Sequence, residues 1–178
     1  VDAVQLGVLP TPGIAFLTTG MRADAGIVIS ASHNSYDDNG IKFFGPDGAK
    51  LDDQQEADIE AWVADPQGTS GSVGRVTELF GAQGDYLREL GRVFDLDLGG
   101  RRVLLDCANG ATCQVAPTAF ERLGATVEVI GASPDGRNIN EGCGSTHLEF
   151  LTEKLVASEA EIGFAFDGDA DRLIVIDE

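Results

Sequence analysis

The sequence predicts an α/β fold built on mixed, mainly parallel sheets. Short runs rich in Val, Ile and Leu alternate with segments whose apolar residues recur every three or four positions, most regularly between residues 102 and 176. Such runs predict buried strands, and such segments predict amphipathic helices. The alternation favours parallel neighbours, because two parallel strands can be joined only through a crossover connection such as a helix.

In the second half of the chain, the strand pattern occurs at 102–107, 126–130, 162–166 and 173–176. The helix pattern occurs at 115–123 and 148–156. In the first of these helices, one face carries Ala116, Ala119, Phe120 and Leu123. A Gly-rich segment, 131–146, is expected to be a loop.

The first half of the chain begins with an apolar run, 1–9, that predicts a buried strand. Thr11 and Pro12 then predict a helix cap with proline at the first helical position, and a short helix to Thr19. The β-branched run at 26–30 predicts a central strand, followed by a polar loop at 31–40.

A hairpin and a helix are expected next. The turn tripeptide Pro46-Asp47-Gly48 is flanked by apolar runs, so 41–44 and 49–51 predict its two arms. Residues 52–64 predict a helix with one apolar face, formed by Ile59, Trp62 and Val63.

Residues 65–81 are rich in Gly, Ser and Thr and predict a domain boundary. We therefore expect two α/β domains, 1–80 and 81–178. The helix expected at 85–94 would connect them.

Composition excludes several classes of protein. The formal net charge of −18 argues against nucleic acid as a partner, because phosphate backbones are bound through Lys and Arg. No apolar run reaches the roughly 20 residues of a membrane span. The three cysteines share no C-x-x-C spacing, so reduced thiols in a cytoplasmic protein are expected. A phosphorylated small substrate is compatible with the charge if the site supplies local cations.

The most informative segment is Asp167-Gly168-Asp169-Ala170-Asp171-Arg172, which follows an apolar run and so lies at the carboxyl end of a strand. Three carboxylates at alternate positions can converge on one cation, and ligands that are all oxygen favour Mg²⁺, Mn²⁺ or Ca²⁺ over zinc. Open α/β sheets bind ligands at that edge.

Two other interpretations of this segment remain. The acids fit positions one, three and five of a calcium-binding EF-hand loop, but Arg172 stands where that loop needs glycine, and the flanking runs predict strands instead of helices. The segment could also be an acidic turn without a metal.

Ser32 lies just past the strand at 26–30, in a polar loop with His33, where it could act as a nucleophile or a phosphate carrier. Taken alone, it could equally be a turn or capping serine. A serine hydrolase is disfavoured, because the G-x-S-x-G elbow is absent. Lys42 begins the next strand and could return to the same site.

Taken together, the two loops resemble the α-D-phosphohexomutases. GIVISASHNSYDDNGIKFF is similar to the phosphoserine loop of that family, and DGDADR to its metal-binding loop. LPTPGIAFLT and LLDCANGAT resemble the family elsewhere. LGATVEVIG and PDGRNINEGCGSTH favour its members that act on glucosamine phosphates over those that act on mannose or glucose phosphates.

The sequence departs from the family pattern at two positions and lacks three family features. Ser35 replaces the usual proline, and Ala170 replaces the common glycine, which is acceptable only if that position does not need a positive φ. The N-terminal arginine segment, the sugar-recognition loop and the C-terminal phosphate-binding domain of the family are not found. The chain thus resembles the end of a first domain plus a second domain, and alone it is expected to be inactive.

The resemblance implies a specific activity and site. Ser32 would carry the phosphoryl group and, with Asp167, Asp169 and Asp171, bind Mg²⁺. Lys42 would handle protons, with His33 as a further candidate that helps to orient the loop, and Arg172 would bind phosphate. The implied reaction interconverts glucosamine 6-phosphate and glucosamine 1-phosphate through a bisphosphate, for cell-wall precursors. The alternatives are a mutase acting on other hexose phosphates and a non-catalytic metal-binding relative. The oligomeric state stays open, a homodimer of the longer enzyme included.

Overall fold

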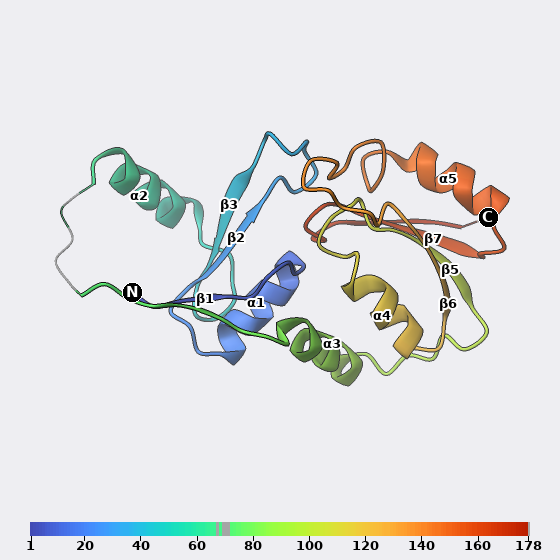
Figure 1. Cartoon of the computed structure of the whole chain (residues 1–178), viewed down its shortest axis with the longest axis horizontal. Coiled ribbons are helices and arrows are strands. Elements are labelled where there is room, and N and C mark those ends of the chain that lie inside the picture. The colour runs from blue at the N-terminus through green and yellow to red at the C-terminus, as the bar shows by residue number, and fades with distance from the viewer. Residues whose placement is uncertain (67, 69–71, 178) are drawn as a thin grey trace.

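The computed structural model describes residues 1–66, 68 and 72–177. Figure 1 shows two halves side by side, with the N-terminal half carrying a long strand pair and the C-terminal half a twisted four-stranded sheet. In the part of the chain that is described, no helix is both long and apolar enough to cross a membrane.

The sheet of the second half contains the four predicted strands: β5 (Arg102–Asp106), β6 (Thr126–Ile130), β7 (Ile162–Phe166) and β8 (Leu173–Ile176). Their order is β6-β5-β7-β8. β5 is parallel to both of its neighbours, whereas β8 is antiparallel to β7. The sheet is therefore mixed and mainly parallel, as predicted.

Two helices cover opposite faces of this sheet, α4 (Val115–Arg122) and α5 (Leu148–Ala157). Alternating side chains of β5 point to opposite faces of the sheet, so each helix packs against a different set of them. Val103 and Leu105 pack in a core with Ala116 of α4, whereas Leu104 between them packs with Leu151 of α5. Because both faces of β5 are covered, its buried residues Val103, Leu104 and Leu105 are all apolar, with no polar residue alternating between them.

Leu151 should be a major contributor to the stability of the second half. Its side chain is fully buried against β5 and β7. We expect Leu151→Ala to lower the free energy of unfolding by about 3 kcal/mol, because truncation leaves a cavity that the sheet cannot fill. Val156→Ala is the matched control, since Val156 lies on the same helix but is 84% exposed. Equal losses for the two variants in chemical denaturation would contradict this packing.

The first half is organised around the antiparallel pair β2 (Gly26–Ser30) and β3 (Gly40–Phe44). Helix α1 (Thr11–Gly20) packs against β2, and α3 (Ala82–Val93) packs against α1. Their shared core contains Leu9, Ile14, Leu17, Val28, Phe44, Ala82, Leu87 and Val115. The expected connecting helix is thus also a core element of this half.

Two strand predictions for the first half need correction. The predicted buried strand at 1–9 is only β1 (Ala3–Gln5), which is exposed and pairs in parallel with β4 (Val76–Glu78). β2 was predicted as a central strand, but among the described residues it pairs with β3 alone, and Ile27 and Ile29 are exposed. Apolar composition predicts the strand itself but not which neighbours cover it.

The turn at Pro46-Asp47-Gly48 forms as predicted, with the Gly45 N–H donating to the Ala49 carbonyl at 2.8 Å. Its second arm is a single bridge at Lys50 and not a strand.

Helix α2 (Asp53–Ala64) also matches the prediction, and its Asp52 and Gln55 form a capping box. Its predicted apolar face is largely unpacked, because Trp62 and Val63 are exposed and only Ile59 is half-buried. The predicted boundary segment 65–81 contains β4, and its residues 67 and 69–71 lie outside the described part of the chain.

Candidate active site and metal centre

The polar loop 31–40, called the serine loop below, and the segment 167–172, called the acidic turn, meet where the two halves face each other. Ser32 follows β2, and Asp167 follows β7, 135 residues later. The Gly168 N–H donates to the Ser32 carbonyl at 3.0 Å, and the Ser32 hydroxyl lies 3.4 Å from Asp167 Oδ2. The structure thus brings together the two segments that the sequence singled out separately.

The acidic turn gathers its three carboxylates because Asp167 caps it from within. Asp167 Oδ1 accepts the N–H groups of Asp171 and Arg172, both at 3.1 Å, which curls the chain back on itself. One oxygen from each of Asp167, Asp169 and Asp171 then lies within 4.8 Å of the others. Asp167 and Asp169 are buried, and burial raises the pKa of Asp167.

The tight turn requires a left-handed residue at Ala170, whose φ is 62°. The sequence analysis expected alanine to be acceptable here only if the position did not need a positive φ. That expectation is wrong, because Ala170 adopts a positive φ. The strain is on the order of 1 kcal/mol. The surrounding hydrogen bonds hold the turn in spite of it.

Lys42 reaches the acidic turn from β3, as the sequence suggested. Its Nζ lies 2.6 Å from Asp169 Oδ2, 2.6 Å from Asp171 Oδ2 and 3.5 Å from Ser32 Oγ. Burial acts to lower the pKa of Lys42, but the two carboxylates outweigh it and raise the pKa overall. The ammonium group is therefore held in its charged form between the acids.

Thr11 is a site residue that the sequence reasoning missed. It was predicted as a helix cap, but Pro10 is the N-cap and Thr11 is the first residue of α1. Its side chain is buried and donates to Asp169 Oδ2 at 2.5 Å, and its N–H donates to the Asp169 carbonyl at 2.8 Å. Burial raises the pKa of Asp169, but hydrogen bonds from Lys42 and Thr11 outweigh it, so the pKa falls below its ordinary value.

The carboxylate cluster fits a hard divalent cation. Asp169 Oδ1 is buried and has no hydrogen-bond partner, although its other oxygen has two. A buried carboxylate oxygen without a partner costs free energy of desolvation unless a hydrogen-bond donor or a cation binds it. Within the described residues, this is the one group in which three carboxylate, thiolate or imidazole ligands converge. Oxygen-only ligands favour Mg²⁺, Mn²⁺ or Ca²⁺.

Among the described residues, the side chains of His33 and Arg172 form no hydrogen bond or ion pair with the three aspartates. His33 Nδ1 is buried without a partner, and the residue lines a second cavity of about 310 Å³ together with His147. Arg172 contributes its backbone N–H to Asp167, whereas its side chain is exposed and forms no ion pair with the described residues.

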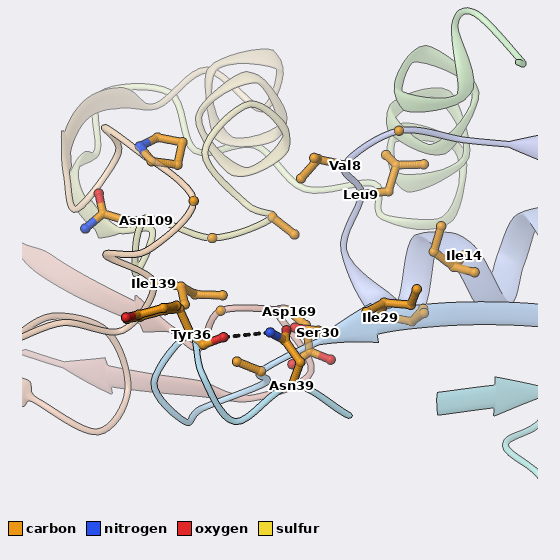
Figure 2. Close-up of a pocket in the computed structure, with 18 of the residues that line it drawn as sticks. Val8, Leu9, Ile14, Ile29, Ser30, Tyr36, Asn39, Asn109, Ile139 and Asp169 are labelled. Atoms are coloured by element: carbon orange, nitrogen blue, oxygen red, sulfur yellow. Dashed lines mark hydrogen bonds between the residues drawn. The ribbon is translucent and has the colours of Figure 1, made fainter. Parts of the chain in front are cut away.

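A larger cavity of about 380 Å³ adjoins the turn. Figure 2 shows it between the end of β2, the segment at Val8 and Leu9, and the loops that carry Asn109 and Ile139. Its lining is mostly apolar, with Asp169 and Ser30 at one side. Both halves of the chain contribute to its walls.

Models of a known family match both halves. The model described as phosphoglucomutase/phosphomannomutase, alpha/beta/alpha domain I, matches residues 1–69, and the model of alpha/beta/alpha domain II matches residues 84–178. The chain belongs to the phosphoglucomutase/phosphomannomutase family. Its fold is accordingly that of phosphohexomutase α/β domains.

Curated members of this family align with nearly the whole chain. Phosphoglucosamine mutase of Pelotomaculum thermopropionicum is 52% identical over 99% of the chain, and that of Halalkalibacterium halodurans is 50% identical over 100%. The chain spans about 41% of the length of each.

Solved structures of the family share the fold. A Burkholderia thailandensis phosphoglucomutase/phosphomannomutase family protein superimposes with a TM-score of 0.85 at 32% identity, covering 99% of this chain and 40% of its own. An Aspergillus fumigatus N-acetylphosphoglucosamine mutase, solved with GlcNAc-6P and magnesium, shares the fold at a TM-score of 0.57 and 15% identity, covering 93% of this chain and 46% of its own.

Proposed function

We propose that this chain forms the phosphoryl-transfer half of a phosphoglucosamine mutase, which interconverts glucosamine 6-phosphate and glucosamine 1-phosphate. One observation carries the proposal: the hydroxyl of Ser32 adjoins both the acidic turn and the Lys42 ammonium. The identity of about 50% with curated phosphoglucosamine mutases supports the choice of substrate. The free cysteines are consistent with the cytoplasm as its location.

The proposed cofactor is Mg²⁺, held by Asp167, Asp169, Asp171 and an oxygen on Ser32. When bound, it would act as a Lewis acid that neutralises charge on the phosphoryl group. The unpartnered Asp169 Oδ1 and the convergence of the three carboxylates support this assignment. The Lys42 ammonium now contacts two of these carboxylates, so it would have to give up part of that contact.

Ser32 would act as the phosphoryl carrier. In the first transfer its P–O bond breaks, the free hydroxyl of glucosamine 6-phosphate forms a new P–O bond, and the hydroxyl proton ends on Ser32 Oγ. The bisphosphate then turns around, its other phosphoryl group returns to Ser32, and the Oγ proton passes to the oxygen that is released. A covalent carrier divides one difficult transfer into two matched ones.

Three further side chains have proposed roles in this reaction. Lys42 lies 3.5 Å from Ser32 Oγ and can deliver a proton there. Arg172, exposed beside the turn, would bind a phosphate group. His33 would orient the serine loop.

A mutase for other hexose phosphates is the second candidate. The Burkholderia protein supports this candidate, because it is named for the phosphoglucomutase/phosphomannomutase family and has a TM-score of 0.85. The two candidates differ in the sugar alone, so a comparison of kcat/KM for glucosamine 6-phosphate, glucose 6-phosphate and mannose 6-phosphate decides between them. A non-catalytic metal-binding relative would bind Mg²⁺ but acquire no phosphate on Ser32.

The function is tested in a chimera, in which this chain replaces the matching segment of the Pelotomaculum mutase. We expect the chimera to convert glucosamine 6-phosphate, whereas the 178-residue chain alone shows no measurable turnover. The site groups named above, all among the described residues, serve the reacting phosphate, so we expect the chain alone to lack the binding energy that orients the sugar and the distal phosphate. Turnover by the chain alone close to that of the chimera would contradict this account. An inactive but folded chimera would contradict the proposed function.

Lys42 should compete with the metal. We expect Lys42→Met to raise the Mg²⁺ affinity of the unphosphorylated chain by about tenfold, because a positive charge beside the site is removed and two carboxylates are freed. Isothermal titration calorimetry measures the effect. Lys50→Met is the matched control, since Lys50 pairs with Glu56, outside the acidic turn. Unchanged or weaker binding by the Lys42 variant would place the metal elsewhere.

A further inference from the structure

The serine loop is held in a strained conformation by contacts from outside the loop. Ser32 has a φ of 54°, which is uncommon for a residue with a side chain and needs support from its surroundings. Its carbonyl group accepts two hydrogen bonds from the second half, from the Gly168 N–H at 3.0 Å and from Asn140 Nδ2 at 2.8 Å. The direction of the Ser32 side chain therefore depends on residues more than 100 positions away.

The Asn140 side chain forms two hydrogen bonds to the backbone of the serine loop. Besides the Ser32 carbonyl, its amide donates to the Asn34 carbonyl, also at 2.8 Å. The two carbonyls fix the orientation of the amide, and its Oδ1 is left buried without a partner. Asn140 is only 5% exposed. Its side chain leaves an acceptor unsatisfied while both of its donor N–H groups are used on the turn that contains Ser32.

Asn140 is itself fixed to the rigid end of β5. Its φ is 58°, a conformation that asparagine tolerates better than most residues, and its N–H donates to the Ala108 carbonyl at 2.9 Å. The buried carboxylate of Asp106 accepts the N–H groups of Ala108 at 3.0 Å and Gly144 at 2.7 Å. These bonds tie the loop to the end of a central strand, through Ala108 at Asn140 and through Asp106 at Gly144.

We propose that Asn140 is a positioning residue for the phosphoryl carrier. It holds the backbone of Ser32 against the second half so that the hydroxyl faces the acidic turn, and it acts through Ser32 without touching the substrate. The role rests on the proposed function. The role requires a short side chain that carries two N–H donors. Aspartate has the same length but no donor, and glycine has no side chain.

Hydrogen–deuterium exchange of the 178-residue chain tests whether the Asn140 hydrogen bonds hold the serine loop. Asn140→Asp keeps the shape but removes the donors, and Asn140→Gly removes the side chain while tolerating the positive φ. Both should speed exchange of amides in residues 31–40 by about tenfold, relative to the core strand β5 of the same sample.

Asn138→Asp is the matched control, because among the described residues the Asn138 side chain bonds within its own loop, to Ser133 and Asp135. It should leave exchange of residues 31–40 within about twofold of the parent. Unchanged exchange of those residues in both Asn140 variants would overturn the proposal, whether or not the mutase is active.

Kinetics of the chimera test the consequence for transfer. The Asn140 variants should lower kcat by about tenfold or more while KM changes little, because the carrier is misplaced but the sugar contacts remain. Asn138→Asp should leave both constants unchanged. A raised KM at constant kcat would mean that Asn140 contacts the sugar, and would overturn the positioning role. Absence of phosphate on Ser32 in the parent chimera would instead refute the proposed function. The exchange experiment would still decide whether Asn140 holds the serine loop.

Discussion

Replacing Ser32 with alanine should abolish turnover in the chimeric mutase and remove its phosphate label. The expected loss is about 10⁴-fold or more, because the proposed reaction needs the Ser32 oxygen to carry the phosphoryl group between the two transfers. Peptide mass spectrometry of the parent should locate the phosphate on Ser32 in the peptide that also contains Ser30 and Ser35. The fold should survive, because Ser32 is only partly buried and its carbonyl contacts do not involve its side chain.

Ser35→Ala is the matched control for that experiment. Ser35 is exposed and lies in the same loop, and its hydroxyl donates to Asp37 at 2.6 Å instead of to a residue of the acidic turn. Its loss should leave turnover within about threefold of the parent. Phosphate on Ser30 or Ser35, or full activity of the Ser32 variant, would show that the carrier has been assigned to the wrong residue.

Replacing Asp169 with asparagine should weaken Mg²⁺ binding and reduce turnover by about 10²–10³-fold, because an electrostatic contact to the transferring group is lost at a buried position. Asp169 is the carboxylate on which the site converges, with Thr11 and Lys42 bound to one oxygen and the other oxygen unpartnered. Calorimetry and steady-state kinetics measure the two effects, and circular dichroism checks that the variant is folded.

Asp38→Asn makes the same change of charge at an exposed position of the serine loop. It should leave both Mg²⁺ affinity and turnover close to those of the parent. If the Asp169 variant behaved like this control, the acidic turn would be an ordinary structural turn, and the metal assignment would have to be abandoned.

Most of the second half could be predicted from the sequence, because β5, β7 and the helices between them follow strong periodic patterns. The acidic turn was also predictable, since three alternate carboxylates after a strand are unusual without a shared ligand. The first half was harder. β2 has the composition of a central strand, yet Ile27 and Ile29 are exposed, because burial depends on neighbouring chain segments and not on the strand itself.

Thr11 and Asn140 show what local patterns cannot predict. Thr11 precedes a proline and so has the pattern of a helix cap, but its hydroxyl binds Asp169, 158 residues away. Asn140 sits in a Gly-rich loop with no periodic signal, and its partners lie 108 and 106 residues earlier. Neither contact has a local signature, although both residues lie in segments that resemble the family.

The sequence by itself determined the α/β class, the order of strands and helices in the second half, and the chemical types at the site: one serine, one lysine and three aspartates. These follow from local periodicity and from side-chain chemistry, which act over a few residues. Only the tertiary structure decided that Lys42 lies between Asp169 and Asp171, that Ala170 adopts a positive φ, and that Asn140 holds the serine loop. Those facts depend on how two distant loops pack against each other, and packing is a property of the whole chain.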